Sequence, residues 1–244
     1  MAANRIAHIN RPGHRRLPRL VLLICCLAFC GPLLAVDPPS PREEFISAWN
    51  AASRGDRSVF SHLPESLRQY QLFPYLVYEE LRYDRARVQP ATINQFLEQH
   101  SDWAFAGGLR NAWLKTLGKQ GKWADLLRYY QDANSTELRC YRARALLETG
   151  RLEGLEAEAQ KLWVAGSSQP DACDPVFAWL NRNGGITAEL AWQRVFLAMT
   201  AGNARFTLYL ARFLPANERI LLERWQDQNR TGYRNLSRTT SWHD

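Results

Sequence analysis

Two cysteines are the residues of this chain best placed to do chemistry. The sequence holds 5 cysteines, but Cys25, Cys26 and Cys30 lie in an apolar N-terminal segment with the features of an export signal. Removing that segment leaves Cys140 and Cys173. An even pair of cysteines in an oxidising compartment predicts a disulfide. The bond would close a loop of about 34 residues and stabilise the fold by roughly 3–4 kcal/mol on the chain-entropy account. Two buried free thiols are the alternative.

Other residue types that bind metals or transfer protons show no useful spacing. The chain has no CxxC sequence, and the histidines outside the N-terminal segment are scattered along it. Glutamates are expected on solvated faces of helices. No catalytic residue, metal site or cofactor is therefore predicted. The residues concerned are His62, His100, His243, Glu79, Glu80, Glu98 and Glu223.

The N-terminal segment, residues 1–35, predicts a cleaved signal peptide. A basic stretch precedes an apolar run from Leu20 to Leu34, and Ala35 offers a small residue at the cut. The run is too short to span a membrane comfortably, because a transmembrane helix needs about 20 apolar residues. A lipid-attachment site around Cys30 is the weaker alternative, since bulky Phe29 stands where such sites carry a small residue.

Most of the positive charge belongs to that segment. The whole chain has a formal net charge of +7, from 31 Lys and Arg against 24 Asp and Glu. The segment contains Arg5, Arg11, Arg15, Arg16 and Arg19 but no acidic residue. The exported chain is thus close to neutral, and nucleic-acid binding is not expected.

Apolar residues recur at helical spacing through most of the remaining chain. The offsets i, i+3, i+4 and i+7 place apolar side chains on one face of a helix, and no stretch shows the alternation of a strand. The mature chain is therefore predicted to be all-α. The stripes are Phe45, Ala48, Trp49 and Ala52; Trp123, Leu126, Leu127 and Tyr130; Leu152, Leu155, Ala159 and Leu162; Trp192, Val195, Phe196 and Met199; and Phe206, Tyr209, Leu210 and Phe213.

Glycines lie between these stripes. Gly55, Gly121, Gly150 and Gly202 each follow one stripe and precede the next. Glycine takes the left-handed conformation that closes a helix, so each position predicts the turn of a helical hairpin. The spacing is irregular, which favours a superhelical α-solenoid of TPR-like hairpins over a strict repeat.

Composition divides the chain into four segments. Residues 1–35 form the signal, residues 36–42 a short linker, and residues 43–225 the helical domain. Residues 226–244 are polar and rich in Arg, Thr and Asn, which predicts a disordered tail. The solenoid would then end without a capping helix, which is typical of a truncated protein.

Four short segments carry a resemblance to a known family. They are FPYLVYEEL at 73–81, LRCY at 138–141, GSSQPDACD at 166–174 and LAMTAGN at 197–203. The third is the most specific, because it joins a proline turn to Cys173. From about residue 43 to about residue 215, the chain resembles the soluble lytic murein transglycosylases of Gram-negative bacteria.

The resemblance implies the opening part of that family's superhelical U-shaped domain, a periplasmic location and peptidoglycan glycan strands as partners. Family members cut the MurNAc–GlcNAc bond and release a 1,6-anhydro product through a separate lysozyme-like domain. In the family, a catalytic Glu-Ser pair is accompanied by the motifs Gly-Leu-Met-Gln and Ala-Tyr-Asn-Ala-Gly-Pro. The chain lacks both motifs. We therefore expect a scaffold that is not catalytic alone.

Two alternatives to a scaffold fragment stay open at this point. One is a stand-alone periplasmic helical-repeat module that binds peptidoglycan or cell-wall proteins, with no membrane contact after signal cleavage. The other is a remnant that folds poorly. Neither makes the chain an active enzyme.

Some side chains could contact a glycan, although each has a simpler explanation. Trp103 or Trp163 could stack on a sugar, but an aromatic on these stripes is expected in the core. Arg82, Arg85 and Arg87 form a basic cluster, and most such clusters are solvated helix faces.

Overall fold

The structure is a computed structural model that describes residues 38–132 and 134–239. Every regular element in these residues is helical, so the all-α prediction is confirmed. The elements, with η marking 3₁₀ helices, are α1 (Pro41–Ser53), η1 (Ser58–His62), α2 (Glu65–Arg68), α3 (Phe73–Asp84), α4 (Pro90–Gln99), α5 (Ala106–Lys119), α6 (Trp123–Tyr129), α7 (Thr136–Glu148), α8 (Leu155–Trp163), η2 (Asp171–Cys173), α9 (Asp174–Arg182), α10 (Ala188–Thr200), α11 (Ala204–Leu210), η3 (Ala211–Phe213) and α12 (Ala216–Thr239).

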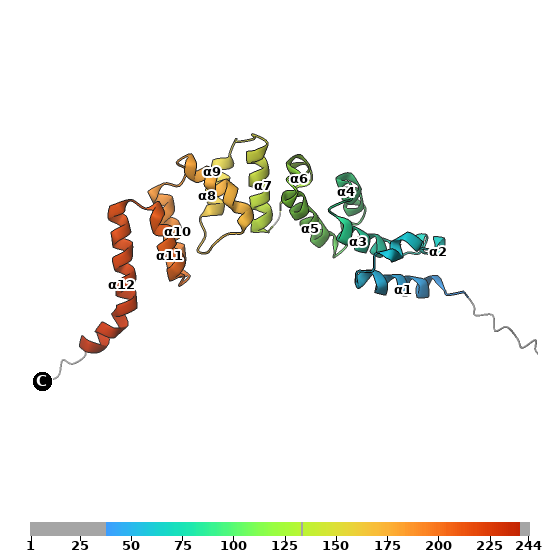
Figure 1. Cartoon of the computed structure of the whole chain (residues 1–244), viewed down its shortest axis with the longest axis horizontal. Helices are drawn as coiled ribbons and strands as arrows, with labels where there is room; N and C mark the ends of the chain where they lie inside the picture. Colours follow the sequence, from blue (N-terminus) through green and yellow to red (C-terminus); the bar gives the residue numbers. More distant parts are fainter. Residues whose placement is uncertain (1–37, 133, 240–244) are drawn as a thin grey trace, which may run out of the picture.

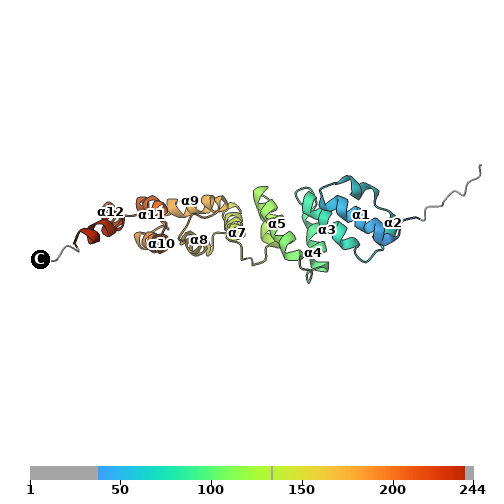
Figure 2. The same cartoon turned by 90° about the horizontal axis from the view of Figure 1, so that it is seen from below.

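The helices follow one another in a bent row, with α7 near its crown and α1 and α12 toward opposite ends (Figure 1). Contacts join neighbours in chain order, such as α5 with α6 and α7, α7 with α8 and α9, and α10 with α11. Seen after a quarter turn, the row is long and narrow (Figure 2). Each hairpin thus buries its apolar face against the next, as a solenoid requires.

Two hydrophobic cores lie along the row. The smaller core gathers residues of α1, α2 and α3, with Ala52 and Leu76 at its centre. The larger one runs from α3 to α12 and contains Trp113 and Trp163. Tyr75 connects the regions, because its ring lies 6.0 Å from that of Trp49 in α1 and 5.4 Å from that of Phe105 just before α5.

The predicted helix ends agree with the backbone. Gly55, Gly121, Gly150 and Gly202 all have positive φ. At the start of α7, the Ser135 hydroxyl accepts the backbone N–H of Leu138, as expected for an N-cap. These local signals define the hairpins independently of packing.

The predicted apolar stripe of α10 is wrong by one residue. Phe196 was expected in the core but is 63% exposed, while Arg194 is only 4% exposed. The buried face of α10 consists of Ala191, Arg194, Val195 and Ala198. Small residues at 191 and 198 let the helix approach its neighbours closely, so the large Phe196 lies outside.

The last helix, α12, extends to Thr239 and so covers most of the segment that composition predicts to be a disordered tail. Residues 216–231 contain no glycine or proline and many good helix formers, which favours a helix there. At its start, α12 packs through buried Leu222, and Glu218 accepts a 2.6 Å hydrogen bond from the indole of Trp192.

At the other end, α1 begins at Pro41, within the predicted linker of residues 36–42. Ser40 is its N-cap and forms a capping box with Glu43. The predicted signal peptide lies outside the described residues.

Candidate functional site

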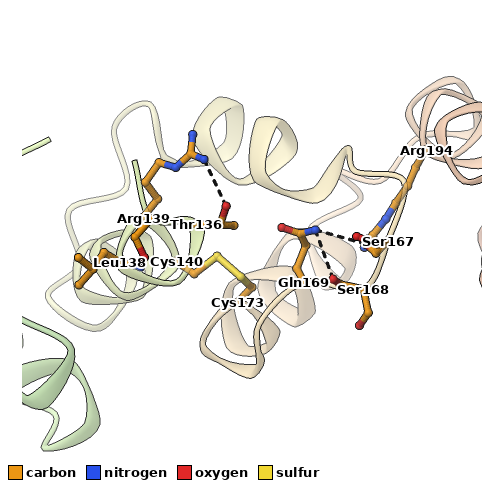
Figure 3. The surroundings of a disulfide bond; sticks show 10 residues. Thr136, Leu138, Arg139, Cys140, Ser167, Ser168, Gln169, Cys173 and Arg194 are labelled. Carbon is orange, nitrogen blue, oxygen red and sulfur yellow. Dashed lines mark hydrogen bonds between the residues drawn. A yellow bond between two sulfur atoms is a disulfide. The ribbon is translucent and has the colours of Figure 1, made fainter. Parts of the chain in front are cut away.

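A disulfide joins Cys140 of α7 to Cys173 at the end of η2, with the Cα atoms 4.7 Å apart (Figure 3). Both cysteines are fully buried. The bond ties the chain segment before α9 to the middle of α7. It therefore fixes one end of the loop formed by residues 164–170.

That loop lies tightly against α10. A Cβ atom added to Gly166 would lie 2.7 Å from the carbonyl oxygen of Leu197, so only glycine fits without displacement. Within the loop, the side-chain amide of Gln169 donates to the carbonyls of Ser167 and Ser168, at 3.3 and 3.4 Å (Figure 3). These contacts give the loop a defined shape.

The loop supplies the hydrogen-bond acceptors of Arg194. The Nε–H of Arg194 donates to the carbonyl of Ala165, and its Nη2 donates to the carbonyl of Ser167, each at 3.3 Å. Its guanidinium carbon lies 4.5 Å from the ring centre of Trp163 and 4.9 Å from that of Phe206. Arg194 is thus held between two aromatic rings by cation–π contacts.

Arg194 is a buried cation with no carboxylate in an ion pair among the described residues. Desolvation lowers the pKa of Arg194 to about 10, against the opposing influence of nearby Tyr209. A pKa of about 10 keeps the guanidinium protonated at neutral pH. Burying an unpaired charge is unfavourable, so the aromatic rings and carbonyls offset only part of that cost.

Arg194 lines a groove of about 1030 Å³ between α8–α9 and α10–α11–η3. Three arginines contribute to its lining against one acidic residue, Asp174. Aromatic rings and side-chain amides make up most of the rest. The lining residues are Trp163, Ser168, Gln169, Asp174, Phe177, Ala178, Asn181, Ile186, Arg194, Asn203, Arg205, Phe206, Tyr209, Arg212 and Phe213.

The aromatic candidates from the sequence fall in different places. Trp163 is 2% exposed, so it is a core residue, although it also lines the groove next to Arg194. Trp103 is half-buried and stacks on Tyr75, with ring centres 4.7 Å apart. The structure does not bring Trp103 and Trp163 into one site.

The arginines of the basic cluster at the C-terminal end of α3 all have partners within the protein. Arg82 forms an ion pair with Glu79 at 2.7 Å, and Arg87 lies 3.8 Å from Asp84. Arg85 donates to the hydroxyl of Thr116 at 3.1 Å. Arg85 thereby links the end of α3 to α5.

The expectation that the glutamates lie on solvated faces is wrong for Glu79. Its side chain is buried in α3 and satisfied by Arg82. Glu98 and Glu223 are exposed, as expected. The pKa of Glu80 is raised by desolvation of its carboxyl and by neighbouring Asp84.

The groove itself was missed by sequence reasoning. Its central residue, Arg194, shares a helix face with Ala191, Val195 and Ala198. An arginine inside such a stripe of small apolar residues was the signal that could have revealed it. The described residues contain no group of three or more His, Cys, Asp or Glu side chains that could hold a metal.

The fold and the groove define a class: an all-α protein of stacked helical hairpins with a basic and aromatic groove between two of them. No protein family model matches the chain. It is 30% identical over 196 residues to the soluble lytic murein transglycosylase of Salmonella typhimurium, covering 79% of this chain and 30% of that protein. Identity with the Escherichia coli K12 protein of the same name is 28% over 197 residues.

Solved structures agree with this similarity. The 70 kDa soluble lytic transglycosylase of E. coli matches with a TM-score of 0.68 and 26% identity, covering 77% of this chain and 31% of that one. An inactive mutant of a lytic transglycosylase from Pseudomonas aeruginosa matches with a TM-score of 0.66 and 31% identity, covering 78% and 32%. The resemblance to the soluble lytic murein transglycosylases is confirmed, over about a third of their length.

Within the residues that the structure describes, no helix is both long and apolar enough to span a membrane.

Proposed function

We propose that the described helical region is the scaffold of a peptidoglycan lytic transglycosylase, holding cell-wall strands without cutting them itself. The similarity to soluble lytic murein transglycosylases carries this proposal, because sequence and fold match over 79% and 77% of the chain. The region spans only 30% of those relatives, so their activity is extended to it as a proposal.

The carboxylates of the described residues support a non-catalytic role. Glycoside cleavage needs an acid held in a cleft beside the sugar, commonly with a second carboxylate opposite. Asp174 is the one acidic residue of the groove and is exposed. Glu79 is buried against Arg82, and Glu80 does not line the groove despite its raised pKa.

A digestion and binding experiment tests this function. The purified chain is incubated with peptidoglycan sacculi, release of anhydro-muropeptides is followed by mass spectrometry, and binding is measured by sedimentation with the sacculi. Binding without release is the expected result. Release of anhydro products would show that the chain cuts glycan itself, and absence of binding would contradict the scaffold role.

The location and partners follow from the same proposal. The chain is proposed to be exported to the periplasm, where peptidoglycan strands are its partner and its disulfide can form. Cell fractionation with a tagged chain tests the location. A stand-alone module for cell-wall proteins instead predicts that a protein, and not the glycan, accounts for retention on sacculi.

A further inference from the structure

We propose that the groove around Arg194 binds a glycan strand that carries no stem peptide, through the carboxylate that is then free on its N-acetylated amino-sugar. This inference rests on the proposed function and names the site and the chemical group that the scaffold recognises.

Arg194 is the first reason. Its hydrogen bonds to the loop use Nε–H and one Nη2 donor, out of the five N–H donors of a guanidinium, and both acceptors are neutral carbonyls. The side chain is 4% exposed and lines the groove. A carboxylate entering the groove would give this cation a charged partner in a poorly solvated position, where such a bond is strongest.

The rim of the groove, defined here by Arg205 and Arg212, adds further positive charge. Arg205 and Arg212 are both exposed and line the groove together with Arg194. Only Asp174 opposes them within the lining, so the groove has a net positive charge. The exported chain as a whole is close to neutral, and this local excess therefore favours an anionic ligand in the groove over the remaining surface.

The uncharged lining suits a sugar. Tyr209 is 48% exposed, its ring is stacked with that of Phe206 at 5.9 Å, and the guanidinium of Arg212 lies 3.9 Å from its ring centre. The exposed part of these rings is apolar surface against which a sugar ring can pack once Arg212 turns to the ligand. The amides of Asn181 and Gln169 offer donors and acceptors for hydroxyl and acetamido groups.

The size of the groove is also adequate. Its volume of about 1030 Å³ lies at the upper end of the range of roughly 300–1,000 Å³ typical of small-molecule sites.

A purely structural role for Arg194 would explain its aromatic and carbonyl contacts, but not the placement of Arg205 and Arg212 on the same groove. The decisive variants therefore change the rim. Arg205→Gln combined with Arg212→Gln removes two exposed charges and leaves Arg194 in place. Arg68→Gln combined with Arg139→Gln makes the same charge change at exposed positions away from the groove.

The experiment measures binding of peptide-free MurNAc–GlcNAc oligomers to the purified chain by calorimetry. A neutral chito-oligosaccharide of equal length and the isolated stem peptide serve as comparison ligands. We expect the acidic oligomer to bind at least about tenfold more tightly than the neutral one, since a charge-assisted pair is stronger than a neutral contact. The rim variant should weaken it about three- to tenfold, as expected for two partly solvated ion pairs.

The Arg194→Lys variant provides a second, independent test. Lysine keeps the charge but loses the planar fork, so binding of the acidic oligomer should fall further than in the rim variant. Melting temperature and circular dichroism are recorded for each variant, and an Arg194→Lys chain that does not fold leaves the rim variant to decide.

Several outcomes would overturn the groove assignment: no binding of the acidic oligomer, equal binding of the neutral one, preference for the stem peptide, or equal effects of the rim and control variants. The proposed function fails separately, if the unaltered chain does not bind sacculi or releases anhydro products from them.

Discussion

At the residue scale, Gly118 shows how one missing side chain sets the distance between two helices. Gly118 lies buried in α5, and a Cβ atom there would lie 2.4 Å from the ring of Tyr141 in α7. Gly107 lies in the same helix with nothing within 4 Å of such an atom. The two glycines therefore make a matched pair.

We predict that Gly118→Ala destabilises the chain by about 1–3 kcal/mol, because the added methyl group forces Tyr141 or the helices apart. Gly107→Ala should be neutral or stabilise it by up to about 1 kcal/mol, because alanine favours helix. Chemical denaturation of both variants measures the difference. Equal stabilities would contradict the close packing of α5 on α7.

Arg194 is a second residue whose surroundings are unusual, because it carries a buried charge. Its guanidinium is buried between Trp163 and Phe206 and keeps its proton at neutral pH, since its pKa is about 10. The charge of Arg194 is thus buried at a cost in free energy, and the side chain also lines a groove that a ligand could enter. Such a combination is a reason to look for a ligand, because a side chain that only filled space there could be apolar.

At the scale of elements, the disulfide links α7 to the loop that contacts α10. Reduction should lower the free energy of unfolding by roughly 3–4 kcal/mol, because the unfolded chain regains the freedom of a closed loop. Thermal melting with and without a reducing agent measures this change. The same reagent should not affect a chain carrying Cys140→Ala and Cys173→Ala, and an effect there would assign the loss to another cause.

The last helix gives a second prediction at this scale. Leu222 is 1% exposed, whereas its neighbour Leu221 is 58% exposed. Leu222→Ala should cost about 2–4 kcal/mol through the lost contacts and the cavity left behind. Leu221→Ala should change stability by less than about 0.5 kcal/mol, as surface substitutions usually do. Similar effects of both substitutions, measured by denaturation, would show that α12 does not dock through this face.

At the scale of the whole molecule, the two cores meet at Tyr75, whose ring contacts Trp49, Trp103 and Phe105. In a row of stacked hairpins, cooperativity depends on contacts between neighbours. Tyr75→Ala removes the ring that spans the junction. We predict that α1–α3 then unfold separately from the remaining helices, giving two transitions in place of one.

Calorimetry and hydrogen exchange can detect this separation. The control is Tyr83→Phe in the same helix, where the ring is 38% exposed and a single transition should persist. One cooperative transition in Tyr75→Ala would mean that other contacts between α3 and α5 couple the cores.

The sequence by itself determined the features that depend on local chemistry. Helical spacing gave the all-α class, and positive φ at Gly55, Gly121, Gly150 and Gly202 follows from the preference of glycine for that conformation. The two cysteines outside the N-terminal segment predicted a pairing that the structure contains. Each of these properties is set within a few residues or by residue type.

Only the tertiary structure decided what each helix face meets. Apolar spacing predicts Phe196 inside, yet α10 buries Arg194 because Trp163, Phe206 and the loop around Ser167 surround it. The groove likewise combines side chains from segments as far apart as Trp163 and Phe213. Spacing along one helix cannot show these partners, because burial and charge pairing depend on distant segments that packing brings together.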